Sequence, residues 1–211
     1  MTDIPKAGFF CAGKTPFSLS CAIRCAYKMM EVLKNGGFDT GALHTEITEP
    51  YSESLMCRAE KTLLYMCNCC DLVITIGCDG FSLSDIMPDI TEKLCAKKVS
   101  YFASVLCGSR RLVLNGNETC GGNGGYIFCP SRASSGICGS ALVMNFPSDI
   151  GFSACIAEAL LPAIGFVIYN ITGKSARNSY EFKNFVNSSL EFHEVFKKEC
   201  IVNFGDIVNL P

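Results

Sequence analysis

The sequence predicts an α/β fold, a three-layer sandwich in which helices cover both faces of a mostly parallel sheet. Apolar runs typical of strands alternate along the chain with stretches of helical period, which is the pattern of such a sheet. The run from Asp71 to Ile76 is apolar at almost every position, as expected of a strand buried on both faces. With 49% hydrophobic and 18% charged residues, the chain can bury a sizeable core. We expect this domain to occupy residues 1–172 and an extension, residues 173–211, to pack on it.

The first half of the chain predicts a β-α-β-α-β order. Three apolar runs are expected as strands, at residues 6–11, 43–47 and 71–76. Between the first two, apolar residues recur at helical spacing from Ala22 to Leu33, and Asn35-Gly36-Gly37 is a strong C-terminal stop. A second helical stripe runs from Met56 to Cys67. These elements alternate as a parallel sheet requires.

The second half adds fewer clear elements. Pro88 suits the first turn of a helix, where its missing N–H group leaves no bond unmade. Residues 115–125 carry five glycines and no apolar pattern, which predicts a loop. A buried strand is expected at 141–146, followed by a helix that begins near Gly151. Residues 172–211 suggest one more helix and a short strand.

Charge and hydropathy narrow the possible partners. The formal net charge is −2, and lysines and arginines occur in ones and twos, so there is no basic stripe for nucleic acid. The first residues lack a basic start followed by a long apolar run, and no window approaches the roughly 20 uninterrupted apolar residues of a membrane span. We therefore expect a soluble, cytoplasmic protein that acts on a small-molecule ligand, with neither nucleic acid nor membrane as a partner.

The fifteen cysteines do not form a metal or disulfide pattern. The count is odd, and the only CxxC motif, at residues 67–70, lacks the second ligand pair that a structural zinc site needs. The two histidines, His44 and His193, do not stand at ligand-like spacing from a cysteine. Most cysteines are therefore expected to be small buried apolar residues.

Two stretches of the sequence carry a family likeness. The first is TIGCDG at residues 75–80 followed by SDIMPD at 84–89, which resembles the TTGGTG and RDVTPE pair of the molybdopterin-binding MogA/MoaB family, to which the gephyrin G domain belongs. The second is SRASSGICGS at residues 131–140, which is similar to the family's LSRSAAGIRGSTLI stretch. The family's NxPG and EALLPAL stretches also have counterparts here, NFP at 145–147 and EALLPA at 158–163. The resemblance covers roughly residues 6–172.

A related domain, CinA, is the alternative. It shares the strand and the glycine turn, but its usual continuation lacks the proline that Pro88 matches. The order and spacing of both motifs favour MogA/MoaB.

The resemblance implies an activity as well as a fold. Members of the family commonly form homotrimers and join molybdopterin to AMP, using ATP and Mg²⁺ and releasing pyrophosphate, ahead of molybdenum insertion. The physical chemistry agrees with this, because N–H groups in a glycine turn and at a helix start are fixed donors for phosphate. A nearby carboxylate can hold the Mg²⁺ that neutralises the phosphate.

The resemblance also implies site residues. Asp85 falls on the family's catalytic, metal-associated aspartate, although an acidic residue before Pro88 could equally be a helix N-terminal charge. Asn145 and Pro147 match the nucleotide end, and Asp79 is a second candidate ligand of the metal. The residues expected to bind molybdopterin or phosphate are Gly77, Cys78, Asp79, Gly80, Ser134, Ser135 and Gly136.

Two open points accompany these assignments. Ser134, Ser135 and Gly136 could instead be an ordinary polar turn. Three arginines could pair with phosphate through two guanidinium N–H groups, Arg110, Arg111 and Arg132, although Arg110 and Arg111 could equally be surface residues.

The sequence departs from the family at three points. Cys78 replaces a glycine, and a side chain forced to positive φ loses roughly 1 kcal/mol. Asp79 replaces a threonine, and an unneutralised carboxylate about 4 Å from a phosphate charge costs roughly 1 to 4 kcal/mol, so either it binds a metal or phosphate lies elsewhere. The family's second acidic residue has no aspartate counterpart in residues 49–53, where Glu49 or Glu53 could substitute with longer reach.

Two interpretations therefore stay open. The protein is either a divergent molybdopterin adenylyltransferase or an inactive homologue that acts as a ligand-binding or interaction protein.

Overall fold

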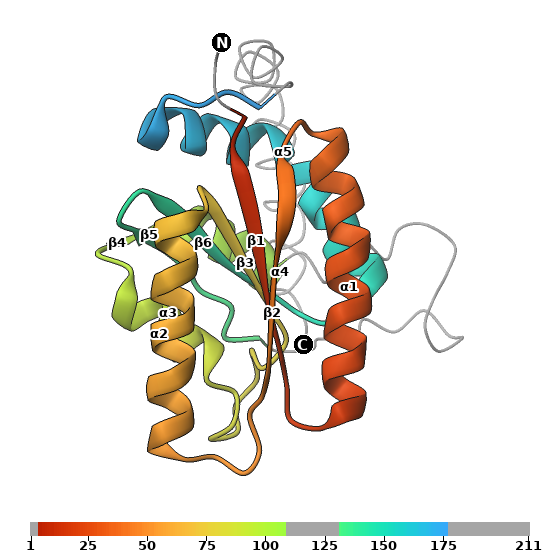
Figure 1. Ribbon diagram of the computed structural model, residues 1–211. Helices are drawn as coiled ribbons and strands as arrows, with labels where there is room; N and C mark the ends of the chain where they lie inside the picture. Colours follow the sequence, from red (N-terminus) through yellow and green to blue (C-terminus); the bar gives the residue numbers. More distant parts are fainter. Residues whose placement is uncertain (1–3, 109–130, 177–211) are drawn as a thin grey trace, which may run out of the picture.

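The computed structural model describes residues 4–108 and 131–176, which form one α/β unit (Figure 1). Two expectations, the glycine-rich loop at 115–125 and the helix and strand beyond residue 176, lie outside the described residues. Within them, residues 173–176 do contact the core. Ala176 is buried, and the Lys174 ammonium lies 2.9 Å from a carboxylate oxygen of buried Asp71.

The sheet is six-stranded and mostly parallel, with the order β2-β1-β3-β6-β5-β4. Strands β2, β1, β3 and β6 run parallel, and β5 and β4 are added antiparallel at the far edge. The bounds are β1 Lys6–Gly13, β2 Asp39–Ile47, β3 Leu72–Ile76, β4 Lys97–Lys98, β5 Ser135–Cys138 and β6 Ala141–Phe146. This sheet confirms the predicted class.

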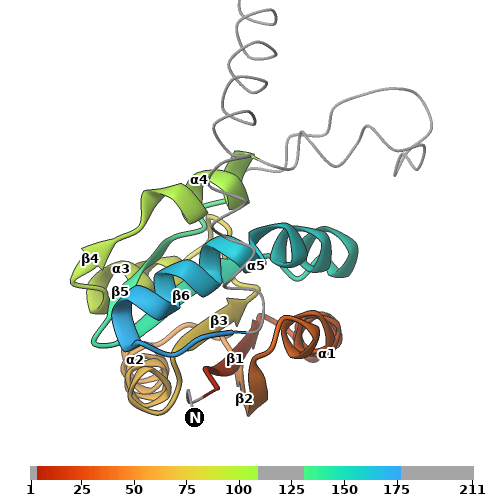
Figure 2. The ribbon, with the colours of Figure 1, turned by 90° about the horizontal axis from the view of Figure 1, so that it is seen from above.

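Helices cover both faces of the sheet, which completes the three layers (Figure 2). One apolar core joins the sheet to α1, α4 and α5, and a second joins the opposite face to α2 and α3. The bounds are α1 Pro16–Asn35, α2 Glu53–Cys69, α3 Met87–Leu94, α4 Ser100–Gly108 and α5 Ile150–Thr172.

Helix α1 shows how local sequence sets an element's ends. Thr15 is its N-cap, accepting from the Ser18 N–H at 3.2 Å, and Pro16 follows in the first turn. The helix ends at Asn35 before Gly37, whose φ of 89° suits glycine, as the sequence predicted.

Three short elements were not predicted, namely β4, α4 and β5. The alternative of an ordinary polar turn at 134–136 is wrong, because Ser135 and Gly136 belong to β5. The reason is close packing, because a Cβ on Gly136 would lie 2.6 Å from the Cys95 Cβ and 2.7 Å from the Lys97 carbonyl oxygen. Glycine here lets β4 pair with β5.

Helix α5 is long and apolar enough to cross a membrane by length and composition. That test alone is weak evidence, because core helices of globular domains also pass it. Half of the helix's apolar window is buried inside the protein, where it packs against α1 and β6. In this structure α5 is a core helix.

Candidate functional site

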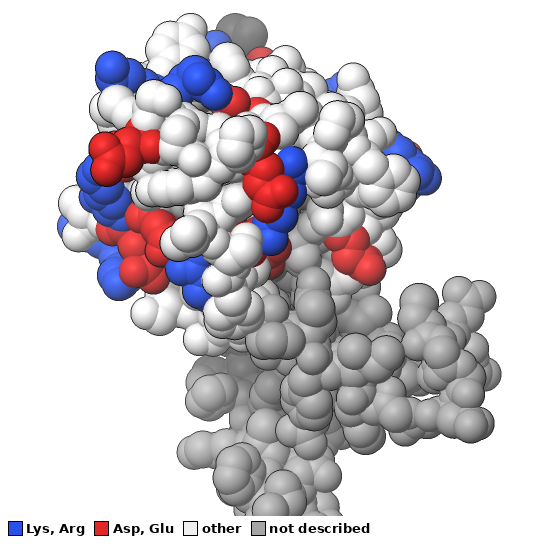
Figure 3. Space-filling view, turned by 90° about the horizontal axis from the view of Figure 1, so that it is seen from below, with Lys and Arg blue, Asp and Glu red and all other residues white. Residues whose placement is uncertain are grey.

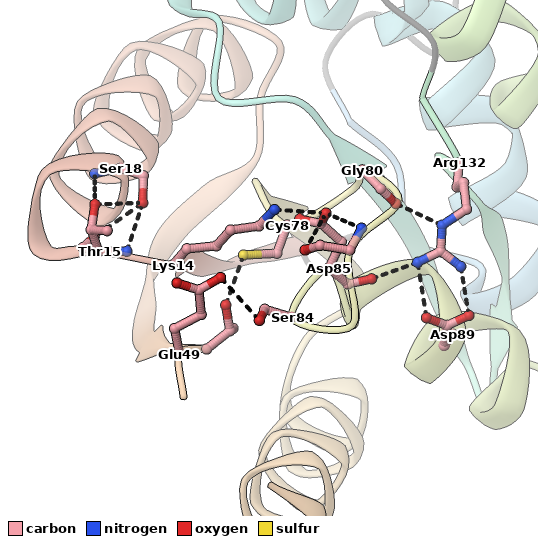
Figure 4. A network of polar contacts seen from close by, with 12 residues as sticks. Lys14, Thr15, Ser18, Glu49, Cys78, Gly80, Ser84, Asp85, Asp89 and Arg132 are labelled. Carbon is pink, nitrogen blue, oxygen red and sulfur yellow. Dashed lines mark hydrogen bonds and ion pairs between the residues drawn. The ribbon is translucent and has the colours of Figure 1, made fainter. Parts of the chain in front are cut away.

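The candidate site lies at the carboxyl ends of β1 and β3, two adjacent parallel strands. Strand β2 lies on one side of β1 and β3 on the other, and the connecting helices α1 and α2 cover opposite faces of the sheet. The strand order therefore reverses beside β1. Open α/β sheets bind their ligands in the crevice formed at such a reversal. Figure 4 shows the polar residues gathered there, from the loops that follow β1, β2 and β3 and from the segment before β5.

The turn after β3 has the shape that the glycines of the motif require. Gly77 has a φ of 83°, and a Cβ there would lie 2.4 Å from the Ala12 carbonyl oxygen of β1. At Gly80 a Cβ would lie 2.7 Å from an Asp85 carboxylate oxygen. Both positions therefore exclude side chains, the first to let two strand ends meet and the second to let Asp85 fold back over the turn.

Cys78 has a φ of 51°, the left-handed conformation expected for a residue in a glycine position. Its sulfur lies 3.2 Å from the Thr48 hydroxyl, and burial raises the pKa of the thiol to about 11. The thiol is therefore protonated at neutral pH and is a poor nucleophile. Cys78 narrows the turn but brings no reactive group to it.

Asp85 is the most buried carboxylate of the site, with 4% of the residue exposed. Its Oδ2 atom accepts three hydrogen bonds, each 2.8 Å long, from the Lys14 ammonium and from the N–H and hydroxyl of Ser82. Burial opposes ionisation, but these hydrogen bonds and the charge of Lys14 outweigh it and hold the pKa of Asp85 below its usual range. Asp85 is an ionised group with a fixed partner.

Lys14 was missed from the sequence. It comes directly after β1, and β1 pairs with β3 in parallel, so the two strands end side by side. The detectable signal was a lysine at a strand end, which becomes informative only once β1 and β3 are known to be neighbours.

Arg132 ties the turn to α3. Its guanidinium donates to both carboxylate oxygens of Asp89, at 2.8 and 3.0 Å, and to the carbonyl oxygens of Gly80 and Asp85, both at 2.6 Å. The Asp89 hydrogen bonds raise the pKa of Arg132. Arg132 was a candidate phosphate ligand, and here its guanidinium is occupied within the protein. Arg110 and Arg111 lie outside the described residues.

Asp79 bonds to the segment before β5 through both its side chain and its backbone. Its carboxylate accepts a 2.6 Å hydrogen bond from the Ser131 hydroxyl, and its carbonyl oxygen accepts from the Arg132 N–H at 2.9 Å. The segment before β5 therefore holds one side of the glycine turn.

Asn145 and Ser134 form a buried network behind the turn. The Asn145 amide donates to the hydroxyls of Thr75 and Thr91, at 2.7 and 2.8 Å, and accepts from the Ser134 N–H at 2.9 Å. Asn145 is fully buried, and its amide bonds link β3, α3 and β6. These contacts give Asn145 a structural part in the site.

Ser135 and Pro147 form hydrogen bonds with residues outside the glycine turn. The Ser135 hydroxyl donates to the Val99 carbonyl oxygen at 2.6 Å and accepts from the Ala103 N–H at 3.1 Å. The Pro147 carbonyl oxygen accepts from the Ser153 hydroxyl at 2.8 Å, at the start of α5. Of the residues expected from the sequence, the structure thus brings Gly77 to Gly80 together with Asp85, places Asn145 and Ser134 behind them, and turns the Ser135 hydroxyl toward α4.

Comparisons with known proteins agree with the α/β fold. The chain is 34% identical over 116 residues to the molybdopterin adenylyltransferases of two Helicobacter pylori strains, 26695 and J99; the match covers 54% of this chain and 60% of theirs. The chain thus spans less than two thirds of the length of these relatives. Among solved structures, MoaB of Thermus thermophilus superposes with a TM-score of 0.64 at 22% identity, over 82% of this chain and all of that one. The chain is thus similar in fold to MoaB and, over part of its length, similar in sequence to molybdopterin adenylyltransferases.

Two further results complete the comparison. A CinA protein from Thermoplasma acidophilum also superposes, with a TM-score of 0.51 at 11% identity, over 76% of this chain and 98% of that one. No protein-family model matches the chain.

The residues present do not offer the ligand set expected for Mg²⁺ in a MogA/MoaB-like site. Among the described residues no three or more His, Cys, Asp or Glu side chains gather to hold a metal ion. Asp85 is neutralised by Lys14, and Asp79 is directed to Ser131. Glu49, one of the two candidate substitutes for the missing aspartate, is exposed and accepts from the Ser84 hydroxyl at 3.2 Å.

Charges of both signs are interspersed on the face that carries the carboxyl ends of the strands (Figure 3). Three large apolar side chains close in sequence to Lys14 and Asp85 are strongly exposed: Phe17, in the first turn of α1, at 80%, and Phe81 and Leu83, on the loop after β3, at 66% and 82%. The site therefore combines a partly buried ion pair with exposed apolar surface around it.

Proposed function

We propose that the protein acts in molybdenum cofactor biosynthesis as a molybdopterin adenylyltransferase, joining molybdopterin to the AMP part of ATP and releasing pyrophosphate. The observation that carries the proposal is the position of Asp85. It folds back over a glycine turn at the carboxyl ends of two parallel strands, in a chain that is 34% identical over 116 residues to a named molybdopterin adenylyltransferase. On the same resemblance we propose a cytoplasmic homotrimer.

The turn supplies donors for phosphate. Within the described residues, no acceptor takes a hydrogen bond from the N–H groups of Cys78, Asp79 or Gly80. Consecutive N–H groups without a protein acceptor at a glycine turn suit a phosphate group. The exposed side chains of Phe81 and Leu83, on the same loop, offer apolar surface for a flat heterocycle such as a pterin.

Adenylyl transfer forms one bond and breaks one. A phosphate oxygen of molybdopterin bonds to the α-phosphorus of ATP while the bond from that phosphorus to the pyrophosphate oxygen breaks. Neither step needs a redox partner, so the protein's part is to position two phosphates and offset their charge. Asp85 serves this by fixing the Lys14 ammonium beside the turn.

The test is an assay of the purified protein with ATP and molybdopterin, following adenylyl-molybdopterin and pyrophosphate. We expect both products, and we expect Asp85→Asn to lower the transfer rate a hundredfold or more, by analogy with the loss of comparable charge contacts in transition states. Asp39→Asn is the matched control, because Asp39 is an exposed aspartate at the opposite end of the sheet. Asparagine preserves the size of the side chain, so the fold should survive.

The inactive interpretation has a distinct outcome. If the unaltered protein binds neither ATP nor molybdopterin, the proposed activity is wrong and a non-enzymatic role remains. If it binds both and transfers nothing, the departures from the family become the cause to test. The combined change of Tyr51→Asp, Cys78→Gly and Asp79→Thr would then be expected to restore turnover.

A further inference from the structure

We propose that Lys14 binds the ligand's phosphate in the place where a divalent cation is expected, so that this site holds phosphate without a metal. This inference rests on the proposed function for the identity of the ligand. Three features support it: the position and exposure of the Lys14 ammonium, the three hydrogen bonds that Asp85 accepts, and the backbone N–H groups of the glycine turn.

Lys14 is directed across the crevice by the strand end that precedes it. A Cβ on Gly13 would lie 2.3 Å from the Leu19 backbone nitrogen, so the start of α1 is packed directly against the end of β1. The chain must turn sharply there, and Lys14 extends toward the loop after β3, where its Nζ atom reaches Asp85 (Figure 4). Two loops of different strands thus share one ion pair.

In the ion pair of Lys14 with Asp85, the ammonium lies at the boundary with solvent and the carboxylate is buried. The Lys14 side chain is 35% exposed, whereas that of Asp85 is 5% exposed. An ammonium carries three N–H donors, and among the described residues only the carboxylate of Asp85 accepts from Lys14. The remaining donors are available to a phosphate that enters from outside.

A metal ion would have to compete with Lys14 for Asp85. Mg²⁺ binds carboxylate oxygens at about 2.0–2.1 Å and needs nearly octahedral geometry. The Oδ2 atom already accepts from three donors, one of them a positive charge 2.8 Å away, and the described residues offer no cluster of further ligands. The ammonium therefore supplies positive charge where Mg²⁺ would bind.

The surroundings of Lys14 also suit an anion. The N–H groups of Cys78, Asp79 and Gly80, which have no acceptor in residues 4–108 and 131–176, belong to the turn over which Asp85 folds. The first turn of α1, which begins two residues after Lys14, carries no acidic side chain, so its positive dipole end is not neutralised from within the helix. The negative charge of the Asp79 carboxylate opposes phosphate binding at this turn, and this carboxylate accepts a hydrogen bond from the Ser131 hydroxyl.

The experiment is a calorimetric titration of inorganic pyrophosphate and of ATP into the full-length protein, once with EDTA and once with Mg²⁺. For the unaltered protein we expect affinities within about twofold under the two conditions. Lys14→Met should weaken binding in EDTA at least tenfold. Mg²⁺ should restore part of that loss, because Asp85 is then free to hold the ion. Lys28→Met is the control, since Lys28 is an exposed lysine of α1 that pairs only with Glu31 among the described residues.

Lys14→Met leaves the buried Asp85 carboxylate with its Ser82 hydrogen bonds but without a positive partner, which destabilises the fold. The double variant Lys14→Met/Asp85→Asn removes both charges and should also lose metal-independent binding, but without the rescue by Mg²⁺. The comparison of EDTA with Mg²⁺ on the unaltered protein needs no variant at all.

Three results would overturn the inference: binding by the unaltered protein that requires Mg²⁺, binding by Lys14→Met that equals that of the unaltered protein in EDTA, or no binding of either phosphate compound under both conditions. The proposed function fails separately. A protein that binds pyrophosphate through Lys14 but forms no adenylyl-molybdopterin would retain this site and lose the proposed reaction.

Discussion

Asp85 makes the stability of the protein sensitive to acid. Its pKa in the folded state lies below the ordinary value of 3.8, so protonation favours the unfolded chain. The stabilisation is fully present above that ordinary value and is lost as the pH falls through the lower folded pKa. We therefore expect the unaltered protein to lose more stability than Asp85→Asn between about pH 5 and pH 3. Urea unfolding at a series of pH values measures this, and parallel pH profiles would contradict it.

Cys78 tests the strain of the glycine turn. Cys78→Gly removes the strain of a side chain at a φ of 51° but also the buried sulfur, whereas Cys78→Ala keeps the strain and loses the contact with Thr48. We expect Cys78→Gly to be more stable than Cys78→Ala by roughly 1 kcal/mol. Thermal or urea unfolding of the two variants is the measurement, and equal stabilities would show that the turn bears no strain.

At the residue scale, sequence motifs pointed to some residues of the candidate site, and only the structure showed the others. Gly77, Gly80 and Asp85 were expected from the sequence because TIGCDG at 75–80 and SDIMPD at 84–89 resemble motifs of the MogA/MoaB family. The parts of Lys14 and of the Ser131 hydroxyl were not predicted, since each bonds to a residue more than 50 positions away in the chain. Such partners become visible only when the order of the strands is known.

At the element scale, the length of a helix or strand decided whether the sequence predicted it. The helices α1, α2 and α5 have long apolar stripes, and β3 and β6 are continuous apolar runs, so all were predicted from the sequence. The two residues of β4 are exposed lysines, and β5 has four residues. Strands of this length are defined by their pairing partners and not by a local pattern.

The contacts of Arg132 join the turn to α3 and can be weighed by substitution. The ion pair with Asp89 is half-exposed and should contribute at most about 1 kcal/mol. The hydrogen bonds to two backbone carbonyl oxygens need the guanidinium fork, which lysine cannot reproduce. We expect Arg132→Lys to lower the unfolding free energy by roughly 1–3 kcal/mol, and more than Asp89→Asn does.

Urea midpoints of the two variants, at an unchanged slope of unfolding free energy against urea concentration, provide the comparison. If Asp89→Asn were as destabilising as Arg132→Lys, the ion pair and not the carbonyl bonds would hold the turn.

At the scale of the whole molecule, the sheet order creates the site. Parallel β1 and β3 end side by side, and their loops leave toward opposite faces, so a ligand can reach both ends at once. The sequence predicted the alternation of strands and helices but not which strands are neighbours. The sequence therefore predicted the class of the fold and Asp85, but not Lys14, with which Asp85 forms an ion pair.

The assembly is the last prediction, and it concerns the surface. The resemblance to MogA/MoaB proteins favours a homotrimer, and the composition agrees, with 49% hydrophobic and only 18% charged residues. Large exposed apolar side chains occur on several elements, among them Tyr27 of α1 and Tyr65 of α2, at 62% and 59% exposure. A stable interface between copies would cover part of this surface. Sedimentation equilibrium at micromolar concentration should give about three times the chain mass of 22.8 kDa. A mass equal to that of the single chain across the concentration series would show that the protein is a monomer, and its site would then have to work within one chain.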